Sequence, residues 1–359
     1  MEMLKDENIR ELVKWYRENK RSFPWRDTND PFDTWISEIM LQQTRAEVVV
    51  DYFIRFRNEI KSIDDLAKID DTRLMRLWEG LGYYSRARNL KKAAIVLCEE
   101  YDSKIPCDHE VLLKLPGIGP YTAGAIMAIG YGLPYPAVDG NVLRVLSRLL
   151  GIREDIRLDS VRKQLEEVIS SYYEENEIKD PSYIRDLSQA LMDLGATICL
   201  PKGNVRCVDC PLKEECYAYK KGLIEEIPYR SKDKARKIVE RTLFIIRDGE
   251  SFLLARRKMN GLLAGMYEFE GADEKLKKKD VAVLMKKRGY DPLKIRKLPS
   301  SKHIFSHLEW HMDAYEVLIG DWTVPLAENE VLVDREGLQK LALPSAFRTY
   351  IDYYALRGE

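Results

Sequence analysis

The sequence predicts a multidomain protein, with an all-α region over residues 1–222 and an α+β domain over residues 237–359. Three observations support this division. Apolar residues recur every three or four positions through the first region, as helices with one buried face require. A proline and a charge run interrupt the pattern at residues 223–236, which we interpret as a linker. Alternating apolar and polar residues beyond it indicate strands.

The helical pattern is clearest in five stretches, residues 1–20, 33–56, 73–98, 140–152 and 182–198. The first of these is charged and amphipathic, and it lacks the apolar segment of a signal peptide. In the C-terminal domain, residues 240–257 predict two strands joined by an Asp-Gly turn, and residues 277–289 predict a helix. Residues 303–320 alternate along their whole length and predict one later strand.

The composition is that of an ordinary globular protein, with 45% hydrophobic and 33% charged residues in a chain of 359. No apolar run approaches the roughly 18 residues that a membrane helix needs. We therefore expect a cytoplasmic, nucleoid-associated protein that does not contact membranes. The net charge of −1 gives no global positive field to attract a polyanion. Backbone amides at helix N-termini can nevertheless bind phosphates with little formal charge.

The stretch LPGIGPYTAGA, residues 115–125, connects an apolar run to a segment of small residues that predicts a helix. Gly117 and Gly119 make this a helix-hairpin-helix pattern. Because glycine has no Cβ, backbone N–H groups there can approach a phosphate closely. Backbone carbonyls of such a hairpin can also hold a Na⁺, K⁺ or Ca²⁺ ion. The glycine spacing alone is equally typical of a plain turn between two helices.

Two carboxylates are candidates for acid–base chemistry. Glu38 shares a helix stripe with Trp35 and Leu41, and a carboxyl desolvated by such neighbours has the raised pKa that a general acid needs. Asp139 precedes another helical pattern, where it can cap the helix or stabilise a positive charge. Taken alone, each has a simpler interpretation: Glu38 as a surface residue paired with Arg45, and Asp139 as a cap.

Four cysteines fall within one short segment, at Cys199, Cys207, Cys210 and Cys216. Their spacing is C-x7-C-x2-C-x5-C, with no histidine inside. Structural zinc prefers two symmetric Cys-x2-Cys pairs, whereas one tight pair with unequal outer arms favours a [4Fe–4S] cluster. We therefore expect a [4Fe–4S] cluster here. The other two cysteines, Cys98 and Cys107, are expected to be free thiols.

A helix-hairpin-helix, an aspartate about twenty residues later and a four-cysteine loop together resemble the endonuclease III superfamily of DNA glycosylases, over residues 20–220. Three motifs are similar to the MutY family, which removes adenine mispaired with 8-oxoguanine: SEIMLQQT, GLGYYSRARNL and MDLGATIC. The likeness implies a barrel over about residues 27–135 and a cluster domain of residues 1–26 plus 136–222. The first cysteine gap departs from the family, with seven residues instead of the usual six.

The resemblance implies a monofunctional glycosylase. Bifunctional relatives have a lysine at the position of Tyr121, where its amine attacks the sugar, and tyrosine cannot form that Schiff base. Glu38 would protonate adenine at N7, and Asp139 would stabilise the cationic sugar. Tyr121 and Asn141 would orient these groups.

The resemblance also assigns the contacts to DNA. Adenine must leave the duplex to reach such a site, and Arg26 and Gln189 are the implied contacts to the extruded base. Wedging side chains fill or support the opened base stack. The implied residues are Gln43 and Tyr83 in the stack, with Thr44 and Leu81 against the opposite base.

The C-terminal domain resembles the Nudix-like domain of the MutY family through GLLAGMYEFEG, residues 261–271, and FSHLEW, residues 305–310. After Gly271 the sequence lacks the glutamate-rich helix that would bind Mg²⁺. The resemblance therefore implies recognition without hydrolysis. Ser306 and His307 would contact 8-oxoguanine, while packing in the core is the simpler role for Phe305 and Trp310.

The expected partner is double-stranded DNA with an A:8-oxoguanine or A:G mispair, bound by a monomer. One alternative keeps the fold and changes the base, for example to thymine opposite guanine. Others are a non-catalytic DNA-binding iron–sulfur protein and a Nudix hydrolase with an accessory domain. The set of Glu38, Tyr121 and Asp139 favours the adenine glycosylase over the binding protein, and the missing Mg²⁺ helix disfavours the hydrolase.

Overall fold

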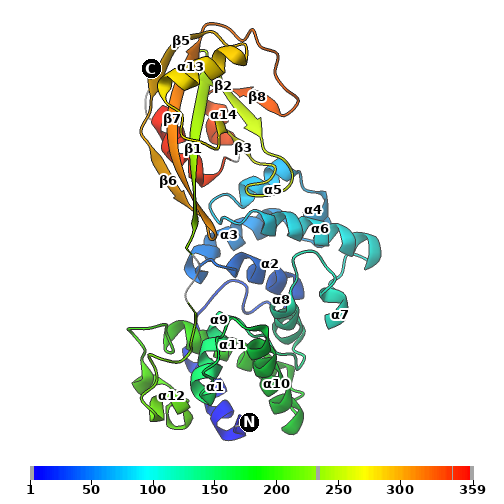
Figure 1. Ribbon diagram of the computed structural model, residues 1–359. Coiled ribbons are helices and arrows are strands. Elements are labelled where there is room, and N and C mark those ends of the chain that lie inside the picture. The colour runs from blue at the N-terminus through cyan, green and yellow to red at the C-terminus, as the bar shows by residue number, and fades with distance from the viewer. Residues whose placement is uncertain (1–3, 232–234, 342, 356–359) are drawn as a thin grey trace. The chain divides into compact units, whose positions relative to one another are not determined.

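The computed structural model describes residues 4–231, 235–341 and 343–355 (Figure 1). The chain forms two compact units, which are described separately. The first consists of Met1–Ile69 and Arg86–Lys232, and the second of Asp70–Ser85 and Asp233–Glu359. Residues 232–234 of the predicted linker lie outside the described residues.

The first unit is helical, as the apolar spacing predicts. Its α-helices are α1 (Asp6–Asn19), α2 (Pro31–Leu41), α3 (Ala46–Glu59), α4 (Ile63–Lys68), α6 (Ser85–Glu100), α7 (His109–Leu112), α8 (Pro120–Ala125), α9 (Gly140–Leu150), α10 (Asp159–Glu175), α11 (Pro181–Thr197) and α12 (Tyr217–Lys220). A π-helix, η1 (Ile126–Tyr131), continues α8, and η2 (Cys207–Asp209) and η3 (Lys213–Glu215) are single 3₁₀ turns. In the described residues, no helix is both long and apolar enough to cross a membrane.

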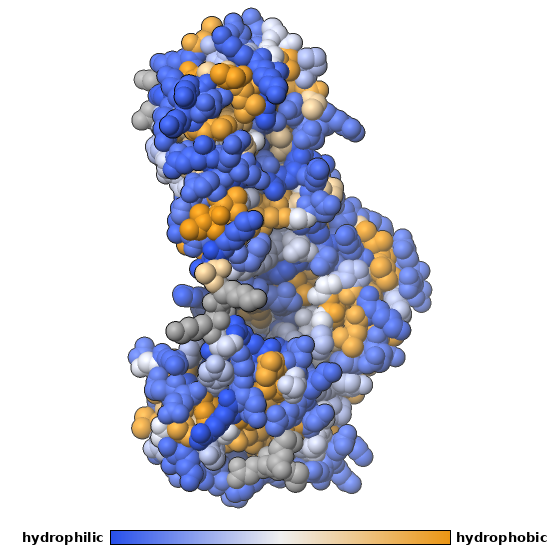
Figure 2. Space-filling model, viewed as in Figure 1, coloured by the Kyte–Doolittle hydropathy of each residue, from blue (hydrophilic) through white to orange (hydrophobic). Residues whose placement is uncertain are grey.

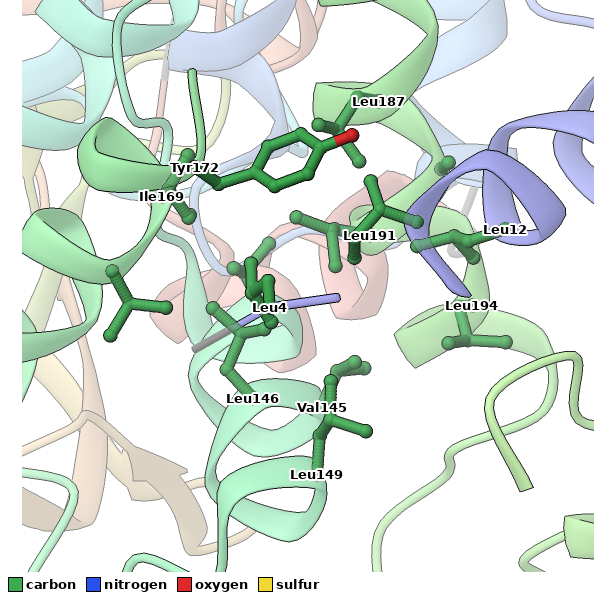
Figure 3. Close-up of a cluster of buried hydrophobic side chains, with 14 of the residues drawn as sticks. Leu4, Leu12, Val145, Leu146, Leu149, Ile169, Tyr172, Leu187, Leu191 and Leu194 are labelled. Carbon is green, nitrogen blue, oxygen red and sulfur yellow. The ribbon is translucent and has the colours of Figure 1, made fainter. Parts of the chain in front are cut away.

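Helices α1, α9, α10 and α11 enclose the main core of the first unit (Figure 3). Leu12, Leu146 and Leu194, from three of these helices, are at most 1% exposed. Helix α11 comes very close to α9 at Gly195, where an added Cβ would lie 2.6 Å from the Cβ of Asn141. This close approach fixes the start of α9 against α11.

Helix α2 is held at both ends. The Asp30 side chain caps its N-terminus by accepting a hydrogen bond from the Phe32 amide (2.9 Å), and Pro31 occupies the first helical position. At the other end the Arg86 guanidinium donates to the carbonyls of Met40 and Gln42, at 2.9 and 2.7 Å. These contacts satisfy groups that a helix end leaves unpaired, and they fix the helix that carries Glu38.

Part of the predicted linker is bonded to the first unit. The Ile227 carbonyl accepts a hydrogen bond from Arg148 Nε (2.7 Å). The Tyr229 carbonyl accepts one from the Ile156 amide (3.1 Å), and the Ser231 hydroxyl donates to Asp155. Long-range contacts of this kind leave no local trace in the sequence.

The second unit contains α5 (Asp71–Leu77) and a mixed α+β fold. Its strands are β1 (Lys237–Arg247), β2 (Phe252–Arg256), β3 (Tyr267–Glu268), β4 (Glu270–Ala272), β5 (Pro292–Lys297), β6 (Ser301–Ile304), β7 (Leu308–Ile319) and β8 (Glu330–Val333). The central order is β3-β2-β1-β7-β5, with β4 on β1, β6 on β7 and β8 on β2. Strands β1 and β7 pair in parallel, from Lys237↔Leu308 to Arg247↔Leu318, and the other pairs are antiparallel.

Helices cover both faces of this sheet (Figure 1). Leu243 and Ile245 of β1 point into one core, with α14 (Arg335–Lys340), η4 (Ser345–Phe347) and α15 (Arg348–Ala355). Phe244 and Ile246 point into the other, with α13 (Lys278–Lys287). This alternation, and the α13 helix, confirm the predicted α+β class.

One strand prediction was wrong. Residues 303–320, expected as one strand, form parts of β6 and β7, and β6 folds back on β7 with Ile304 opposite Glu309. The turn between them contains Ser306 and His307, which are exposed. Serine and histidine are weaker turn signals than glycine or asparagine, so the alternating pattern concealed the reversal.

The surface agrees with the charged composition. Hydrophilic residues cover most of the face in Figure 2, and hydrophobic residues form separate patches. Separate patches of this kind are normal for a folded protein in water.

The close contact of α11 with α9 is testable by Gly195→Ala. Alanine ordinarily stabilises a helix interior by up to about 1 kcal/mol relative to glycine. Here the added methyl group would press on Asn141, so we expect a loss of about 1–3 kcal/mol in the free energy of unfolding. Gly140→Ala is the matched control, since nothing lies within 4 Å of the position of its Cβ. Equal urea midpoints for the two variants would contradict the close packing.

Candidate active site

The first unit contains a cavity of about 780 Å³. Helices α2, α8 and α11, the start of α9 and the segment after α1 contribute to its lining. Eight of the residues proposed from the sequence border this cavity: Arg26, Glu38, Gln43, Thr44, Tyr121, Asp139, Asn141 and Gln189. Residues from positions 26 to 189 of the chain thus converge on one site.

Glu38 is the buried acid of the cavity, with only 6% of its surface exposed. The Tyr121 hydroxyl donates a hydrogen bond to its Oε2 atom. Burial raises the pKa of Glu38 to about 7; the Tyr121 bond opposes that rise, the charge of Asp139 adds to it and Arg26 opposes it. The surface position considered for Glu38, with Arg45 as partner, is therefore wrong. A carboxyl with this pKa can donate a proton near neutral pH.

Asp139 is both a helix cap and a cavity residue. Its Oδ1 accepts hydrogen bonds from the amides of Asn141 (2.9 Å) and Val142 (2.7 Å), and its Oδ2 accepts one from Asn141 Nδ2 (2.8 Å). Burial raises the pKa of Asp139, and these hydrogen bonds and the charge of Arg144 act in the opposite direction. The cap therefore supports the ionised form of a carboxylate that also faces the cavity.

The two proposed base-pocket residues are held by neighbouring groups. Arg26 makes a bidentate pair with Asp193, with Nη1–Oδ2 and Nη2–Oδ1 both 2.6 Å. Gln189 is 7% exposed and donates to the Arg185 carbonyl (3.2 Å). Both residues border the cavity. Their side chains are held in place by these hydrogen bonds.

The remaining predicted DNA contacts in the first unit lie at loops. Gln43 is exposed, in a left-handed conformation with φ +59°, just after α2. Thr44 accepts a hydrogen bond from Arg86 Nη2 (3.4 Å). In the hairpin, Gly117 has φ +82°, and a Cβ there would lie 2.7 Å from Asn89 Cβ. Gly119 precedes α8 with open space at its Cβ position, so its backbone is accessible.

Four predicted residues belong to the second unit. Tyr83 is 45% exposed with φ +48°, whereas Leu81 is 6% exposed. Ser306 Oγ lies 3.4 Å from His307 Nδ1 in the exposed turn between β6 and β7. Beside this turn the Phe305 ring packs edge-on against Trp310, with ring centroids 4.9 Å apart.

The four cysteines form one local group. Burial raises the pKa of Cys210 to about 12, and the nearby Cys199, Cys216 and Cys207 add to that rise. Among the described residues, no three side chains of metal-ligating type lie close enough together to hold a metal ion.

A buried arginine beside the four cysteines indicates which kind of metal centre they can bind. Arg148 is 1% exposed and donates to Cys199 Sγ (3.3 Å) and to the carbonyls of Leu200 (2.7 Å) and Ile227 (2.7 Å). In the described part of the chain its hydrogen-bond partners are the Cys199 sulfur and three backbone carbonyls, the third being that of Ile224 (3.1 Å), and no carboxylate is among them. A buried cation without a carboxylate calls for an anionic neighbour, and thiolates around a metal centre supply one. The chemistry of these four thiols therefore suits a thiolate-bound metal centre, while in the described residues they are not drawn together into ligand positions.

Several residues that hold the cavity residues in place were not predicted from the sequence. Asp193 lies in the MDLGATIC motif, and Arg21 is a second partner for it (Nη2–Oδ1 2.6 Å). Arg144 donates to Asn141 Oδ1 (2.9 Å) and, through Nε, to the Cys199 carbonyl (2.7 Å). The motif is the only sequence signal that could have pointed to Asp193.

The raised pKa of Glu38 predicts a pH-dependent cost in stability. The folded state holds the Glu38 proton up to about pH 7, whereas the ordinary carboxyl loses it near 4.5. Stability is therefore lost as the pH rises through this window, by at most about 3 kcal/mol. Glu38→Gln cannot ionise but can still accept the Tyr121 bond. We expect it to exceed the parental protein in unfolding free energy at pH 8, and by much less at pH 5.

Urea unfolding at the two pH values measures this difference. The exposed Glu99→Gln is the control for removal of one carboxylate and should show no such trend. A parental protein that is as stable as Glu38→Gln at pH 8 would show that Glu38 is solvated.

Comparisons with known proteins agree with this architecture. Residues 36–171 match the HhH-GPD superfamily of base excision DNA repair proteins, and residues 242–353 match the NUDIX domain family. The adenine DNA glycosylase of Buchnera aphidicola (subspecies Baizongia pistaciae) is 32% identical over 325 residues, 89% of this chain and 89% of that protein. The Homo sapiens adenine DNA glycosylase is 31% identical, covering 85% of this chain and 65% of that protein.

Among solved structures, a thermostable thymine-DNA glycosylase aligns with a TM-score of 0.53 and 29% identity, over 59% of this chain and 95% of that one. These matches confirm the predicted pairing of a helix-hairpin-helix glycosylase region with a Nudix-like domain. The match to the Buchnera aphidicola glycosylase decides the relationship, because it covers 89% of this chain and 89% of that protein. The chain belongs to the adenine DNA glycosylase family.

Proposed function

We propose that the protein is a monofunctional DNA glycosylase that removes adenine mispaired with 8-oxoguanine or guanine. The observation that carries this proposal is the buried Glu38, with its pKa raised to about 7, in one cavity with Tyr121 and Asp139. Membership of the adenine DNA glycosylase family supports adenine as the base and DNA as the partner.

Glu38 donates its proton to N7 of the extruded adenine. The bond between the sugar and N9 then breaks, and its electron pair leaves with the neutralised base. Asp139 stabilises the cationic sugar, through its charge or through a transient covalent bond that water displaces. Water adds to the sugar and its proton passes to the Glu38 carboxylate, which leaves an abasic site. The different surroundings of the two carboxyls suit different tasks, one buried beside a phenol and one capping a helix.

Tyr121 and Asn141 orient the two acids. The Tyr121 hydroxyl fixes Oε2 of Glu38, and the Asn141 amide fixes Oδ2 of Asp139. Tyr121 has no amine to form a Schiff base with the sugar, so the strand is left intact by this route. Arg26 and Gln189 contact the adenine from the wall of the cavity.

DNA is held on both sides of the cleaved bond. Gly117 and Gly119 offer backbone amides to a phosphate, and their hairpin binds a Na⁺, K⁺ or Ca²⁺ ion through carbonyls. The exposed Gln43 and Tyr83 enter the opened stack, with Thr44 against the opposite base. Leu81 is 6% exposed, so its contact with that base requires DNA binding to uncover it. Ser306 and His307 recognise 8-oxoguanine from the exposed turn of the Nudix-like domain.

The cysteine group holds a [4Fe–4S] cluster, through Cys199, Cys207, Cys210 and Cys216. The buried charge of Arg148 beside Cys199 supports an anionic group there. Iron and sulfide analysis with visible absorbance tests this, and bound zinc without iron would contradict it. We also propose a barrel over about residues 27–135, a cluster domain of residues 1–26 plus 136–222, and a monomer located at the nucleoid in the cytoplasm.

Thymine opposite guanine is the second candidate substrate, because one of the similar solved structures is a thymine-DNA glycosylase. Adenine is favoured because a buried acid at N7 assists departure of a purine, and thymine has no N7.

Single-turnover base release from duplexes with A opposite 8-oxoguanine, A opposite G or T opposite G separates these substrates. We predict release of adenine only, with strand breakage only after alkali. Glu38→Gln should lose at least about 100-fold in the rate of release, the usual size of a general-acid effect. Release by Glu38→Gln at the parental rate would exclude Glu38 as the acid, and release of thymine alone would select the second substrate.

A further inference from the structure

Asp193 is the buried centre of a charge cluster whose two arginines, Arg21 and Arg26, line the cavity. It projects from α11 and is 1% exposed. Arg26 pairs with both of its oxygens at 2.6 Å, and Arg21 pairs with Oδ1 through Nη2 (2.6 Å) and Nε (3.0 Å). Two guanidinium groups thus share one carboxylate.

Both arginines border the same cavity as Glu38. A positive charge near an acid stabilises its ionised form and lowers its pKa, and the Arg26 charge acts on Glu38 in this direction. Asp193 accepts hydrogen bonds from both Nη atoms of Arg26, and the Arg21 carbonyl accepts a further one from Nη1 (2.9 Å), so these partners hold the guanidinium in place. It also offsets the charge that the two guanidinium groups bring to the cavity wall.

We infer that Asp193 is a positioning residue that keeps the acid of this site protonated at neutral pH, by directing Arg26 away from Glu38 and neutralising it. This inference rests on the proposed role of Glu38 as the proton donor. It assigns a task to an aspartate that touches neither the base nor the sugar.

The other charged groups around Glu38 do not neutralise Arg26, although Asp139 acts directly on Glu38 in the same direction. Tyr121 from α8 donates a hydrogen bond that favours the carboxylate, and Asp139 before α9 disfavours it. From η1 only Ile129 reaches the cavity among the described residues. The remaining charged residues of the lining are Arg45, Glu47 and Arg162. Of these, only Glu47 is acidic, and it is mostly exposed at 69% of its side chain.

If Asp193 only held the fold together, its loss would have a different effect on the measured rates. Asp193 also ties α11 to the segment after α1, through residues 167 and 172 positions away in sequence. Loss of such a tie lowers stability and the fraction of active protein. It does not move the pH at which the acid ionises, so the pH profile separates the two roles.

Asp193→Asn is the test, with single-turnover adenine release measured from pH 5 to pH 9. Asparagine cannot neutralise the two arginines. We therefore expect the alkaline limb of the pH–rate profile, where the rate falls as Glu38 ionises, to move about one pH unit lower. The rate at pH 8 should then fall about tenfold, since tenfold less of the acid is protonated. Arg26→Gln should move the limb upward, and the Asp193→Asn, Arg26→Gln double variant should return it toward the parental position.

Asp33→Asn is the matched control. Asp33 is also buried, lies on α2 with Glu38 and pairs with an arginine, Arg57 Nε, at 2.6 Å, but Arg57, unlike Arg26, does not border the cavity. Its loss should lower stability and leave the limb in place. A limb that does not move in Asp193→Asn overturns the inference.

If Asp193→Asn does not fold, an unmoved limb in Arg26→Gln overturns the inference equally. These outcomes leave the proposed function intact, because the parental protein still releases adenine. A parental protein that releases no adenine removes the proposed function as well.

Discussion

Exclusion of water from one carboxyl group is the constraint on which the first unit depends. Every residue from Phe32 to Met40 is buried, so α2 passes through the interior and not along the surface. Such a helix offers no solvent to a glutamate at its centre, and the carboxyl is held instead by the Tyr121 hydroxyl. The surrounding fold offsets the cost: Asp30 caps one end of α2 and Arg86 closes the other.

Charge is distributed around the cavity so that two acids differ in behaviour. Glu38 faces a phenol and a neutralised arginine, which leaves desolvation as the largest influence on its pKa. Asp139 is also desolvated, but two backbone amides and the Asn141 side chain support its charge. Strongly perturbed groups of this kind cluster at functional sites, at some expense of stability. The pairing of Asp193 with Arg26 is a further example, in which a buried charge pair beside the cavity influences the protonation of Glu38.

The sequence predicted the features that depend on local pattern. Helices followed from apolar spacing, and the position of Glu38 between Trp35 and Leu41 indicated a desolvated acid. Local pattern could not predict the partners of that acid: the role of Tyr121, 83 residues away, came from the family resemblance, and the pairing of Asp193 with Arg26 across 167 residues was not predicted. Pairings at such separation arise only from packing. The β6–β7 reversal was missed for a different reason, because its turn lacks glycine and asparagine.

The protonation state of Glu38 is the central claim, and infrared difference spectroscopy measures it directly. Subtracting the spectrum of Glu38→Gln from that of the parental protein isolates the carbonyl stretch of the protonated side chain. Titration should show that band persisting to about pH 7, as the raised pKa requires. A band already lost at pH 5 would mean that Glu38 is an ordinary carboxylate, and the account of the site would fail.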